Sequence, residues 1–331
     1  MPEQSPVLAA AAEYKAALMR KEAAAVNRLV AAYKRSLDRI ERSVEALVAA
    51  IGDDRPTRGQ LLRMKRYREL TEQVLDELRG LQALTRHEMD QAARIGIQAG
   101  GVDAAKLMSV SITGGVGLAG QFNRLPVAAI EQLLGFLAPD GPLYQRLQLL
   151  APVTTEYVAD AIAEGALLGH NPRRIAASVQ RAFGRGLTDS LRFTRTVQLW
   201  SYREASRATY LANPNVVQMW QWSSALDSRT CSACIAMHGS THPLSEPLRG
   251  HYNCRCSPVP VVVGFDPSIK QNGEEWFRAQ DEATQRAILG PGRFDAWKAG
   301  KFEFRAIAGE HEDTVYGRMI VERPLKELTR Q

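Results

Sequence analysis

Four cysteines and three histidines stand close together in the stretch DSRTCSACIAMHGSTHPLSEPLRGHYNCRC, residues 227–256, of a 331-residue chain with only four cysteines and six histidines in all. Cys231 and Cys234 are separated by two residues, a spacing at which two thiolates in a tight turn can bind one tetrahedral metal ion. His251 and Cys254 repeat this spacing, and Cys256 follows. The stretch therefore predicts a Zn²⁺ site that uses four of these five side chains.

Three ligand sets satisfy this prediction. Each contains Cys231 and Cys234, completed by His251 with Cys254, by Cys254 with Cys256, or by His251 with Cys256. Every set fills all four positions with protein atoms and leaves none for water, so the ion would be structural. A disulfide, free thiols, a thioredoxin-like redox pair and an HNH-type nuclease site are the alternatives for the same residues.

Two predicted strands flank the cysteine-rich stretch. Residues 216–224 (VVQMWQWSS) alternate in the manner of a strand, and residues 257–265 (SPVPVVVGF) are rich in β-branched residues, with prolines that suit an edge strand or the start of a strand. The 33 residues from 225 to 257 hold few large apolar side chains, so a cross-link between their ends would explain how they are ordered. His238 and His242 are interpreted as ordinary residues of this loop.

The N-terminal region is predicted to form two long helices over residues 8–84, joined by the turn GDDRPTRG at residues 52–59. Each helix has an apolar seam at alternating spacings of three and four residues. The seam residues are Val26, Val30, Tyr33, Leu37, Ile40, Val44, Leu47 and Ile51 in the first helix and Tyr67, Leu70, Val74, Leu78 and Leu81 in the second. We expect the helices to pack on each other, with docking onto another subunit as the alternative.

The middle of the chain is predicted to be helical with several breaks. The glycine-rich residues 95–120 are expected to form an irregular connection, followed by apolar periodicity over 125–137, a turn at 138–142 and helices within 143–168. Asn171 and Pro172 start a further helix that Gly184 and Gly186 are expected to end, before another helix over 187–212. The tail is expected to return to helix around Trp276 and around Trp297.

These elements predict a mainly α protein with a small α+β C-terminal domain. Its parts are a long N-terminal helical hairpin or docking region (1–95), a helical middle domain with Arg-rich helices (96–212), and a short antiparallel β-unit with a Cys/His-linked loop plus C-terminal helices (213–331). The start, MPEQSPVLAA, lacks a basic segment, and the two longest uncharged runs are too polar to span a membrane. We expect no membrane association, no small-molecule substrate and no catalytic residues.

Arginines are concentrated between residues 171 and 210. Eight arginines and two acids occur there, an excess as large as the formal net charge of +6 of the whole chain. Such a stripe can follow a phosphate backbone, or it can be solvated or paired within the fold. The candidate residues for a contact with DNA or an acidic partner are Arg174, Arg181, Arg185, Arg192 and Arg195.

The order of these motifs along the chain is characteristic. A helix start GHNPRRIA at 169–176 is followed by a helix with Arg195 and Thr196, then WQWSSALDSRTCSAC and, after a gap, HYNCRC. This order resembles the phage Mu F-like family of minor head, or head morphogenesis, proteins, over roughly residues 165–305. The matching residues are Trp220, Trp222, Asp227, Arg229, Thr230, Cys231, Cys234, His251, Asn253, Cys254, Arg255 and Cys256. Val197 departs from the pattern, since the family usually has an acidic residue there.

The resemblance implies a non-enzymatic virion protein present in few copies at the portal vertex or capsid interior, assembled in the host cytoplasm. Its implied partners are the portal protein and the major capsid or scaffolding proteins, with the packaged DNA as a further contact. A basic arginine stripe suits the interior of a DNA-filled shell. The alternative function is a zinc-containing DNA-binding or nuclease-type enzyme.

Overall fold

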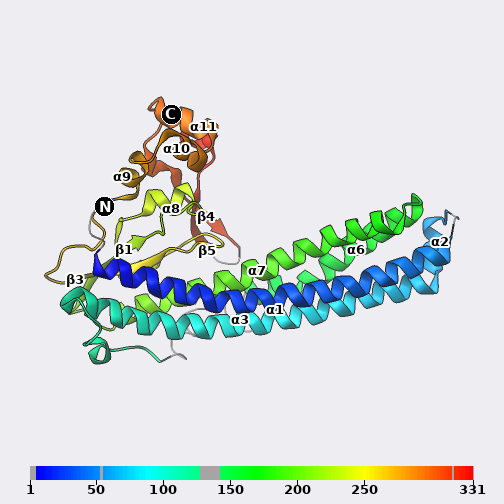
Figure 1. The fold of residues 1–331 in the computed structure, drawn as a ribbon, viewed down its shortest axis with the longest axis horizontal. Coiled ribbons are helices and arrows are strands. Elements are labelled where there is room, and N and C mark those ends of the chain that lie inside the picture. The colour runs from blue at the N-terminus through cyan, green and yellow to red at the C-terminus, as the bar shows by residue number, and fades with distance from the viewer. Residues whose placement is uncertain (1–4, 53–54, 127–141, 315–316, 331) are drawn as a thin grey trace. The chain divides into compact units, whose positions relative to one another are not determined.

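The structure is a computed structural model that describes residues 5–52, 55–126, 142–314 and 317–330. The described chain is mostly helical, with small antiparallel sheets toward the C-terminus, which confirms the predicted fold class (Figure 1). It divides into two compact units. We call residues 1–20, 93–138 and 196–331 the sheet unit, and residues 21–92 and 139–195 the helical unit.

The two units are not consecutive along the chain. The long helices α1 (Pro6–Ile51), α3 (Lys65–Thr113) and α7 (Pro172–Leu211) each contribute residues to both units. The predicted boundary after residue 95 falls inside α3, and the one after residue 212 falls just beyond the end of α7.

The helical unit contains parts of α1, α3 and α7 together with α2 (Arg58–Arg63), α5 (Pro142–Gln148) and α6 (Leu150–Leu167). The two predicted seams share one buried core, in which Ile40 and Val44 of α1 belong with Leu70 and Val74 of α3. The seams therefore pack within this chain, as expected, although Val30 stays 41% exposed. The described ends of the predicted turn agree with it, because Gly52 has a φ of +64° after α1 and Thr57 caps α2, while residues 53–54 lie outside the described residues.

The expected irregular connection at 95–120 was wrong, because α3 continues to Thr113. The reason is a close approach of α3 to α7. A Cβ at Gly96 would lie 2.3 Å from the carbonyl oxygen of Gln198, and one at Gly100 would lie 2.2 Å from that of Tyr202. These glycines therefore permit two helices to touch rather than interrupting one, and the helix ends before Gly114, whose φ is +71°.

The expected break at Gly184 and Gly186 was also wrong, since α7 is one helix of 40 residues. Its predicted start is confirmed, because the side chain of Asn171 accepts a hydrogen bond from Arg174 N at 2.9 Å. Interior glycines cost about 1 kcal/mol each relative to alanine, which burial of Val179 and Phe183 in the core outweighs. Helices within 143–168 are confirmed as α5 and α6, whereas the periodicity at 125–137 and the turn at 138–142 fall almost wholly outside the described residues.

The sheet unit is built around a three-stranded antiparallel sheet of order β2-β1-β3. These strands are β1 (Val217–Ser223), β2 (Thr241–Pro243) and β3 (Ser257–Val262), so the two predicted strands are confirmed and β3 is an edge strand. β2 was not expected, and with it the interpretation of His242 as an ordinary loop residue was wrong. His242 pairs with Trp220 across the strands and stacks on its ring at 4.4 Å.

Short elements complete the sheet unit. They are η1 (Ala119–Gln121), α8 (Ser232–Met237), α9 (Gly273–Arg278), α10 (Glu282–Leu289), α11 (Pro291–Lys298), η3 (Phe304–Ile307), β4 (Ala308–Asp313), β5 (Gly317–Glu322) and α12 (Leu325–Leu328). The tail helices around Trp276 and Trp297 are confirmed as α9 and α11, but the β4–β5 hairpin was not foreseen. Among the described residues, none of the helices combines the length and apolar character needed to span a lipid bilayer.

Candidate metal centre

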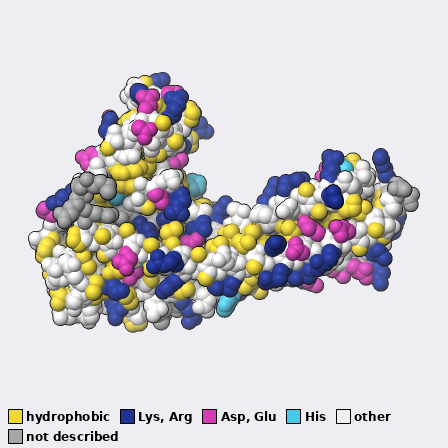
Figure 2. Space-filling view, viewed as in Figure 1, with side chains coloured by type: hydrophobic (Ala, Val, Ile, Leu, Met, Phe, Trp, Pro, Cys, Tyr) yellow, Lys and Arg dark blue, Asp and Glu magenta, His cyan; other side chains and the backbone are white. Residues whose placement is uncertain are grey.

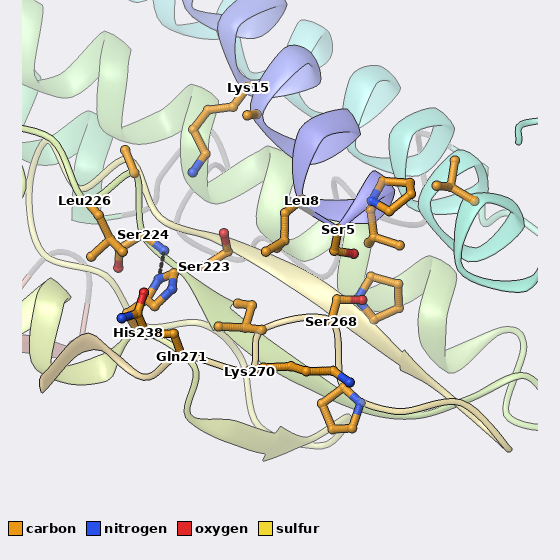
Figure 3. A pocket seen from close by; sticks show the side chains of 18 of the residues that line it. Ser5, Leu8, Lys15, Ser223, Ser224, Leu226, His238, Ser268, Lys270 and Gln271 are labelled. Carbon is orange, nitrogen blue, oxygen red and sulfur yellow. Dashed lines mark hydrogen bonds between the residues drawn. The ribbon is translucent and has the colours of Figure 1, made fainter. Parts of the chain in front are cut away.

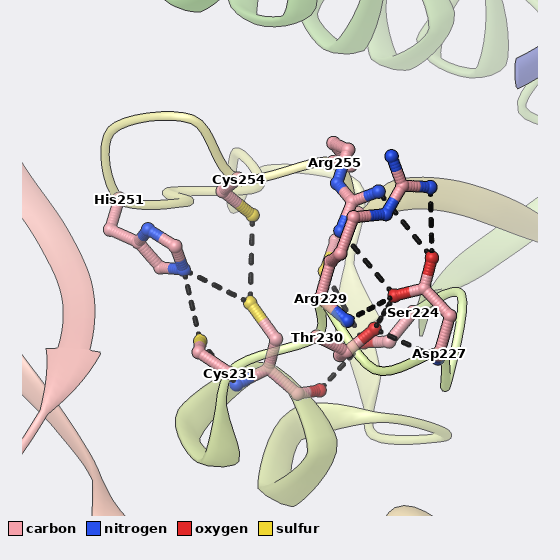
Figure 4. A network of polar contacts seen from close by, with 10 residues as sticks. Ser224, Asp227, Arg229, Thr230, Cys231, His251, Cys254 and Arg255 are labelled. Carbon is pink, nitrogen blue, oxygen red and sulfur yellow. Dashed lines mark hydrogen bonds and ion pairs between the residues drawn. The ribbon is translucent and has the colours of Figure 1, made fainter. Parts of the chain in front are cut away.

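The two halves of the cysteine-rich stretch approach each other from α8 and from the turn before β3 (Figure 4). Cys231 is the N-cap of α8, and Cys234 lies in its first turn with its N–H 3.4 Å from the Cys231 sulfur. The turn that carries His251 and Cys254 contains Asn253, whose φ of 58° is a left-handed conformation that asparagine tolerates better than most residues. Both segments belong to the sheet unit.

The side chains from the two segments are within metal-binding range of one another. His251 Nε2 lies 3.1 Å from Cys231 Sγ and 3.3 Å from Cys234 Sγ. Cys234 Sγ lies 3.6 Å from Cys254 Sγ. Around a tetrahedral Zn²⁺, sulfur–nitrogen and sulfur–sulfur separations are about 3.5 and 3.8 Å. The donor atoms of these three pairs therefore need to separate by only a few tenths of an ångström to accommodate the ion, whereas Cys254 would also have to approach Cys231 or His251, because these three residues do not all lie within 4.8 Å of one another.

Two overlapping groups of donors satisfy the distance criterion for a metal ion, and they share Cys234. One combines Cys231, Cys234 and His251, and the other Cys234, Cys254 and Cys256, with the donor atoms of each group within 4.8 Å of one another. All four cysteines are free thiols in the structure. The residues that sequence spacing selected are therefore gathered in one place and can hold a metal ion.

The orientation of His251 suits a metal ligand. Its Nδ1 lies 2.6 Å from the carbonyl oxygen of Tyr252 and donates a hydrogen bond to it. Nε2 is thereby directed at the sulfurs of Cys231 and Cys234. Loss of the proton on Nε2, with Nδ1 still protonated, gives the tautomer that binds metal through Nε2. A metal-bound histidine usually has such a partner on its other nitrogen.

Cys256 is placed differently from the other three thiols. Its sulfur lies 3.2 Å from the hydroxyl of Ser224, and that hydroxyl lies 2.6 Å from the carbonyl oxygen of Cys234. Because a hydroxyl has one hydrogen and a carbonyl can only accept, Ser224 donates to Cys234 and Cys256 donates its S–H to Ser224. This hydrogen bond requires Cys256 to be a protonated thiol.

The thiols of the cluster differ in pKa accordingly. Hydrogen bonding by Cys234, helped by His251, lowers the pKa of Cys231 to about 5 although burial opposes this. Burial raises the pKa of Cys256 to about 12. Burial alone would lower the pKa of His251, but its hydrogen bond to Cys231 and the charge of Cys254 raise it to about 9. The cluster thus favours a thiolate at Cys231, the form that binds a metal ion.

A buried arginine from α7 holds the backbone of the segment that carries Cys254 and Cys256. Arg203 is 3% exposed and donates from Nε to the carbonyl oxygen of Cys256 at 2.9 Å and from Nη2 to that of Cys254 at 2.6 Å. Gly250 leaves room for this arrangement, because a Cβ there would lie 2.6 Å from Cys254 Sγ and 2.8 Å from Arg203 Nη1. One guanidinium group therefore fixes the backbone at both Cys254 and Cys256.

The DSRT motif forms a separate polar network beside the sulfurs (Figure 4). Asp227 accepts hydrogen bonds from the backbone N–H of Arg229 at 3.0 Å and the hydroxyl of Thr230 at 2.9 Å. It also pairs with the guanidinium groups of Arg229 at 3.1 Å and Arg255 at 3.4 Å. Asp227 thus joins the segment before Cys231 to the residue between Cys254 and Cys256, and contacts with these donors lower its pKa although burial opposes them.

The C-terminal β4–β5 hairpin also contacts both segments that carry the candidate ligands. Glu322 of β5 accepts from Ser232 N at 2.8 Å and from its hydroxyl at 2.7 Å, at the start of α8, and pairs with Arg293 at 2.9 Å. Tyr252 donates to Asp313 of β4. Sequence spacing alone could not identify these contacts, nor those of Arg203, because they join segments 50 to 90 residues apart.

The arginines proposed for a DNA or partner contact fall into two groups, all on α7 in the helical unit. Arg192 pairs with Asp189 at 3.0 Å and Arg195 with Glu22 at 2.5 Å. The others are exposed: Arg174 near the start of the helix, Arg181 beside Ser178, and Arg185 over the ring of Tyr157 at 5.1 Å.

The sequence comparison agrees with the position of this site. Residues 156–259 match the family model described as Phage Mu protein F like protein. The chain carries a Mu F-like domain. No curated protein and no solved structure matches the chain significantly.

The Mu F-like match contains all five candidate ligands and confirms the resemblance derived from their order. It also contains Arg203, Ser224 and Asp227, which position the ligand segments. It ends at residue 259, so it does not extend over the tail that the sequence resemblance included, and Glu322 lies beyond it.

Proposed function

We propose that this protein is a phage minor head protein that acts in head morphogenesis, and that its Mu F-like domain is held together by a structural Zn²⁺ ion. The observation that carries this proposal is the Mu F-like match over the segment in which the Cys/His cluster closes. The portal protein and the major capsid or scaffolding proteins are the proposed partners. The capsid interior at the portal vertex is the proposed location.

The proposed ligands are Cys231, Cys234, His251 and Cys254. His251 Nε2 faces two of the sulfurs, and Cys254 Sγ lies next to Cys234, whereas the Cys256 thiol donates its proton to Ser224. This set of three thiolates and one imidazole is typical of structural zinc, and it leaves no open coordination position. The ion would join α8 to the turn before β3 and stabilise the loop between them.

This ligand set is tested with a matched pair of serine variants two residues apart. We expect Cys256→Ser to keep about one zinc ion per chain, since serine retains the hydrogen bond to Ser224, and Cys254→Ser to lose it. Elemental analysis of the purified variants measures this directly. Retention of zinc by His251→Ala together with its loss in Cys256→Ser would show that Cys256 is the fourth ligand instead.

The head-protein proposal is tested on particles. Particles assembled without this protein should be altered in yield, DNA content or infectivity, and normal values in all three would refute the role. The nuclease alternative predicts cleavage of plasmid DNA by the pure protein with a divalent metal ion, abolished by His251→Ala. The geometry does not favour that alternative, because His251 is directed at thiols rather than at a position open to a substrate.

The exposed arginines of α7 are the proposed contact with packaged DNA. Arg174, Arg181 and Arg185 are separated by seven and four residues, which places them along one side of the helix. Arg55 lies next to the turn before α7, since a Cβ at Gly169 would be 3.4 Å from Arg55 Nε.

Residues 55–68 extend this basic region, because they contain six exposed cations and no acid. Lys and Arg side chains are prominent over this end of the helical unit, near α2 (Figure 2).

The DNA contact is tested by the salt dependence of binding. Replacing Arg174, Arg181 and Arg185 by alanine should lower the slope of log K against log salt by up to about 2.7, because each lost phosphate contact removes about 0.9. Arg39→Ala is a suitable control, since Arg39 is paired with Glu77. An unchanged slope in the triple variant would exclude these arginines from DNA binding.

A further inference from the structure

A cavity of about 1340 Å³ lies in the sheet unit, next to the Asp227 network that borders the metal cluster (Figure 3). Its walls come from the start of α1, the end of α3, the segment after β1 and residues 265–271. It is larger than the roughly 300–1,000 Å³ of most small-molecule pockets. Much of the wall is apolar, including Leu8, Met19, Val110, Leu226, Val262 and Trp276.

Three polar groups converge on this cavity, and each has a donor atom without a partner among the described residues. Lys15 reaches from α1 toward the segment that carries Ser223 and Ser224, and its amine forms no hydrogen bond or ion pair with any described residue (Figure 3). The hydroxyl of Ser223, which is 7% exposed, has no hydrogen-bond partner in the described part of the chain either. Burial lowers the pKa of Lys15, and the nearby Cys256 and Cys254 thiols oppose this shift.

The third group is His238. Its Nδ1 accepts a hydrogen bond from Ser224 N at 3.0 Å, and burial, helped by the charge of Lys15, lowers its pKa to about 4. The ring is therefore neutral at pH 7 with its proton on Nε2, which has no partner among the described residues. The interpretation of His238 as an ordinary loop residue was wrong, because it is the buried C-cap of α8 and its ring is held by this hydrogen bond.

The charges around the cavity favour an anionic occupant. Its lining includes four cationic side chains and two carboxylates. Asp227 is shared by Arg229 and Arg255, and Asp266 pairs with Lys270 at 3.2 Å, so the lining keeps an excess of two positive charges and none of its carboxylates pairs with Lys15. A lysine without a carboxylate partner in a largely apolar wall matches one carboxylate, whereas a nucleic-acid site presents an array of basic groups.

We propose that this cavity binds a peptide segment of a partner protein in which one Asp or Glu carboxylate is flanked by apolar side chains. The carboxylate accepts hydrogen bonds from Lys15 and His238, and the apolar side chains fill the remaining wall. The segment binds through its side chains rather than as an added strand, because Pro258 and Pro260 deprive the edge strand β3 of two N–H donors.

Binding is tested with two fluorescein-labelled heptapeptide pools of the same design, apolar residues around a central Glu in one and a central Gln in the other. Fluorescence anisotropy with the full chain should show at least about tenfold tighter binding of the Glu pool, the effect of a charged hydrogen bond. Lys15→Met should abolish this preference and Lys15→Arg should keep it. Lys21→Met, an exposed lysine on the same helix, should leave it unchanged.

Three results would overturn the proposal: equal binding of the two pools, an unchanged preference in Lys15→Met, or competition by a 20-nucleotide DNA that depends on Lys15, which would indicate a phosphate site. Zinc content of Lys15→Met is measured in parallel, and loss of the ion would mean that Lys15 serves the thiolates instead. The proposal rests on the head-protein role only for the source of the partner. Because the assay uses isolated protein, its failure is distinguishable from a normal particle phenotype.

Discussion

Replacing Arg203 by methionine should destabilise the sheet unit by roughly 2–4 kcal/mol. The change leaves the carbonyl oxygens of Cys254 and Cys256 buried without their donors, at about 1–3 kcal/mol each. Removing a buried charge relieves part of its desolvation penalty, so the net loss is smaller than the sum of the two. Lysine keeps the charge but has one nitrogen in place of the Nε and Nη2 atoms that serve the two carbonyls, so Arg203→Lys should lose about half as much.

Tryptophan fluorescence during urea unfolding measures this effect selectively, because all five tryptophans of the chain lie in the sheet unit. Arg318→Met is the matched control, since Arg318 is 55% exposed and forms only a surface pair with Glu310 at 3.6 Å. That control should change stability by less than about 1 kcal/mol. The same variants should be titrated with zinc, and Arg203→Met should bind it about 10–100-fold more weakly, the usual effect of removing support from metal ligands.

Two results would contradict this role of Arg203: a loss of less than about 1 kcal/mol in Arg203→Met, or an Arg203→Lys variant as stable as the unmodified protein. Either result would mean that the two carbonyls find other donors when the guanidinium group is absent.

Three further predictions concern backbone and charge. Gly100→Ala should cost roughly 1–3 kcal/mol, because its Cβ would lie 2.2 Å from the carbonyl oxygen of Tyr202, whereas Gly101→Ala, with only an ordinary contact at 3.6 Å, should be neutral or stabilising in thermal unfolding. Asn253→Gly should be tolerated and Asn253→Val should lose roughly 1–2 kcal/mol in the same assay, since φ is 58° there, and equal stabilities would contradict this. The pKa of Glu322 is lowered by contacts with Ser232 and Arg293 that outweigh burial, so its contribution is present above its ordinary pKa of 4.5 and is lost as pH falls through the lower folded value. The stability difference between the unmodified protein and Glu322→Gln should therefore shrink below about pH 4.5 in urea unfolding, and a difference independent of pH would contradict the assignment.

Sequence patterns predicted the features that depend on neighbouring residues. The spacing of Cys231 and Cys234 identified the cluster, and the alternation around Trp220 and Trp222 identified β1, because both patterns are complete within one short segment. The apolar seams of α1 and α3 were readable for the same reason.

Features that depend on a distant partner could not be predicted. Gly96 and Gly100 predict a break in the helix when only the sequence is considered. In the structure α7 packs directly against them, so the absence of a side chain is what permits the contact. In the sequence, Arg203 is one of the eight arginines between residues 171 and 210, whereas in the structure it is buried and bonded to the carbonyl oxygen of Cys254. The β4–β5 hairpin was missed because its first strand, AGEHED, has a polar sequence with no strand-like alternation.

The division of the chain into separated segments bears on the order in which it can fold as it leaves the ribosome. The helical unit needs nothing beyond residue 195, whereas the contact of Glu322 with the start of α8 needs 127 more residues. At about 5–20 residues per second, roughly 6–25 s of synthesis separate these two points. The helical unit can therefore be complete while the cysteines, once made, still lack the hairpin that holds α8, and zinc present in that interval would order them first.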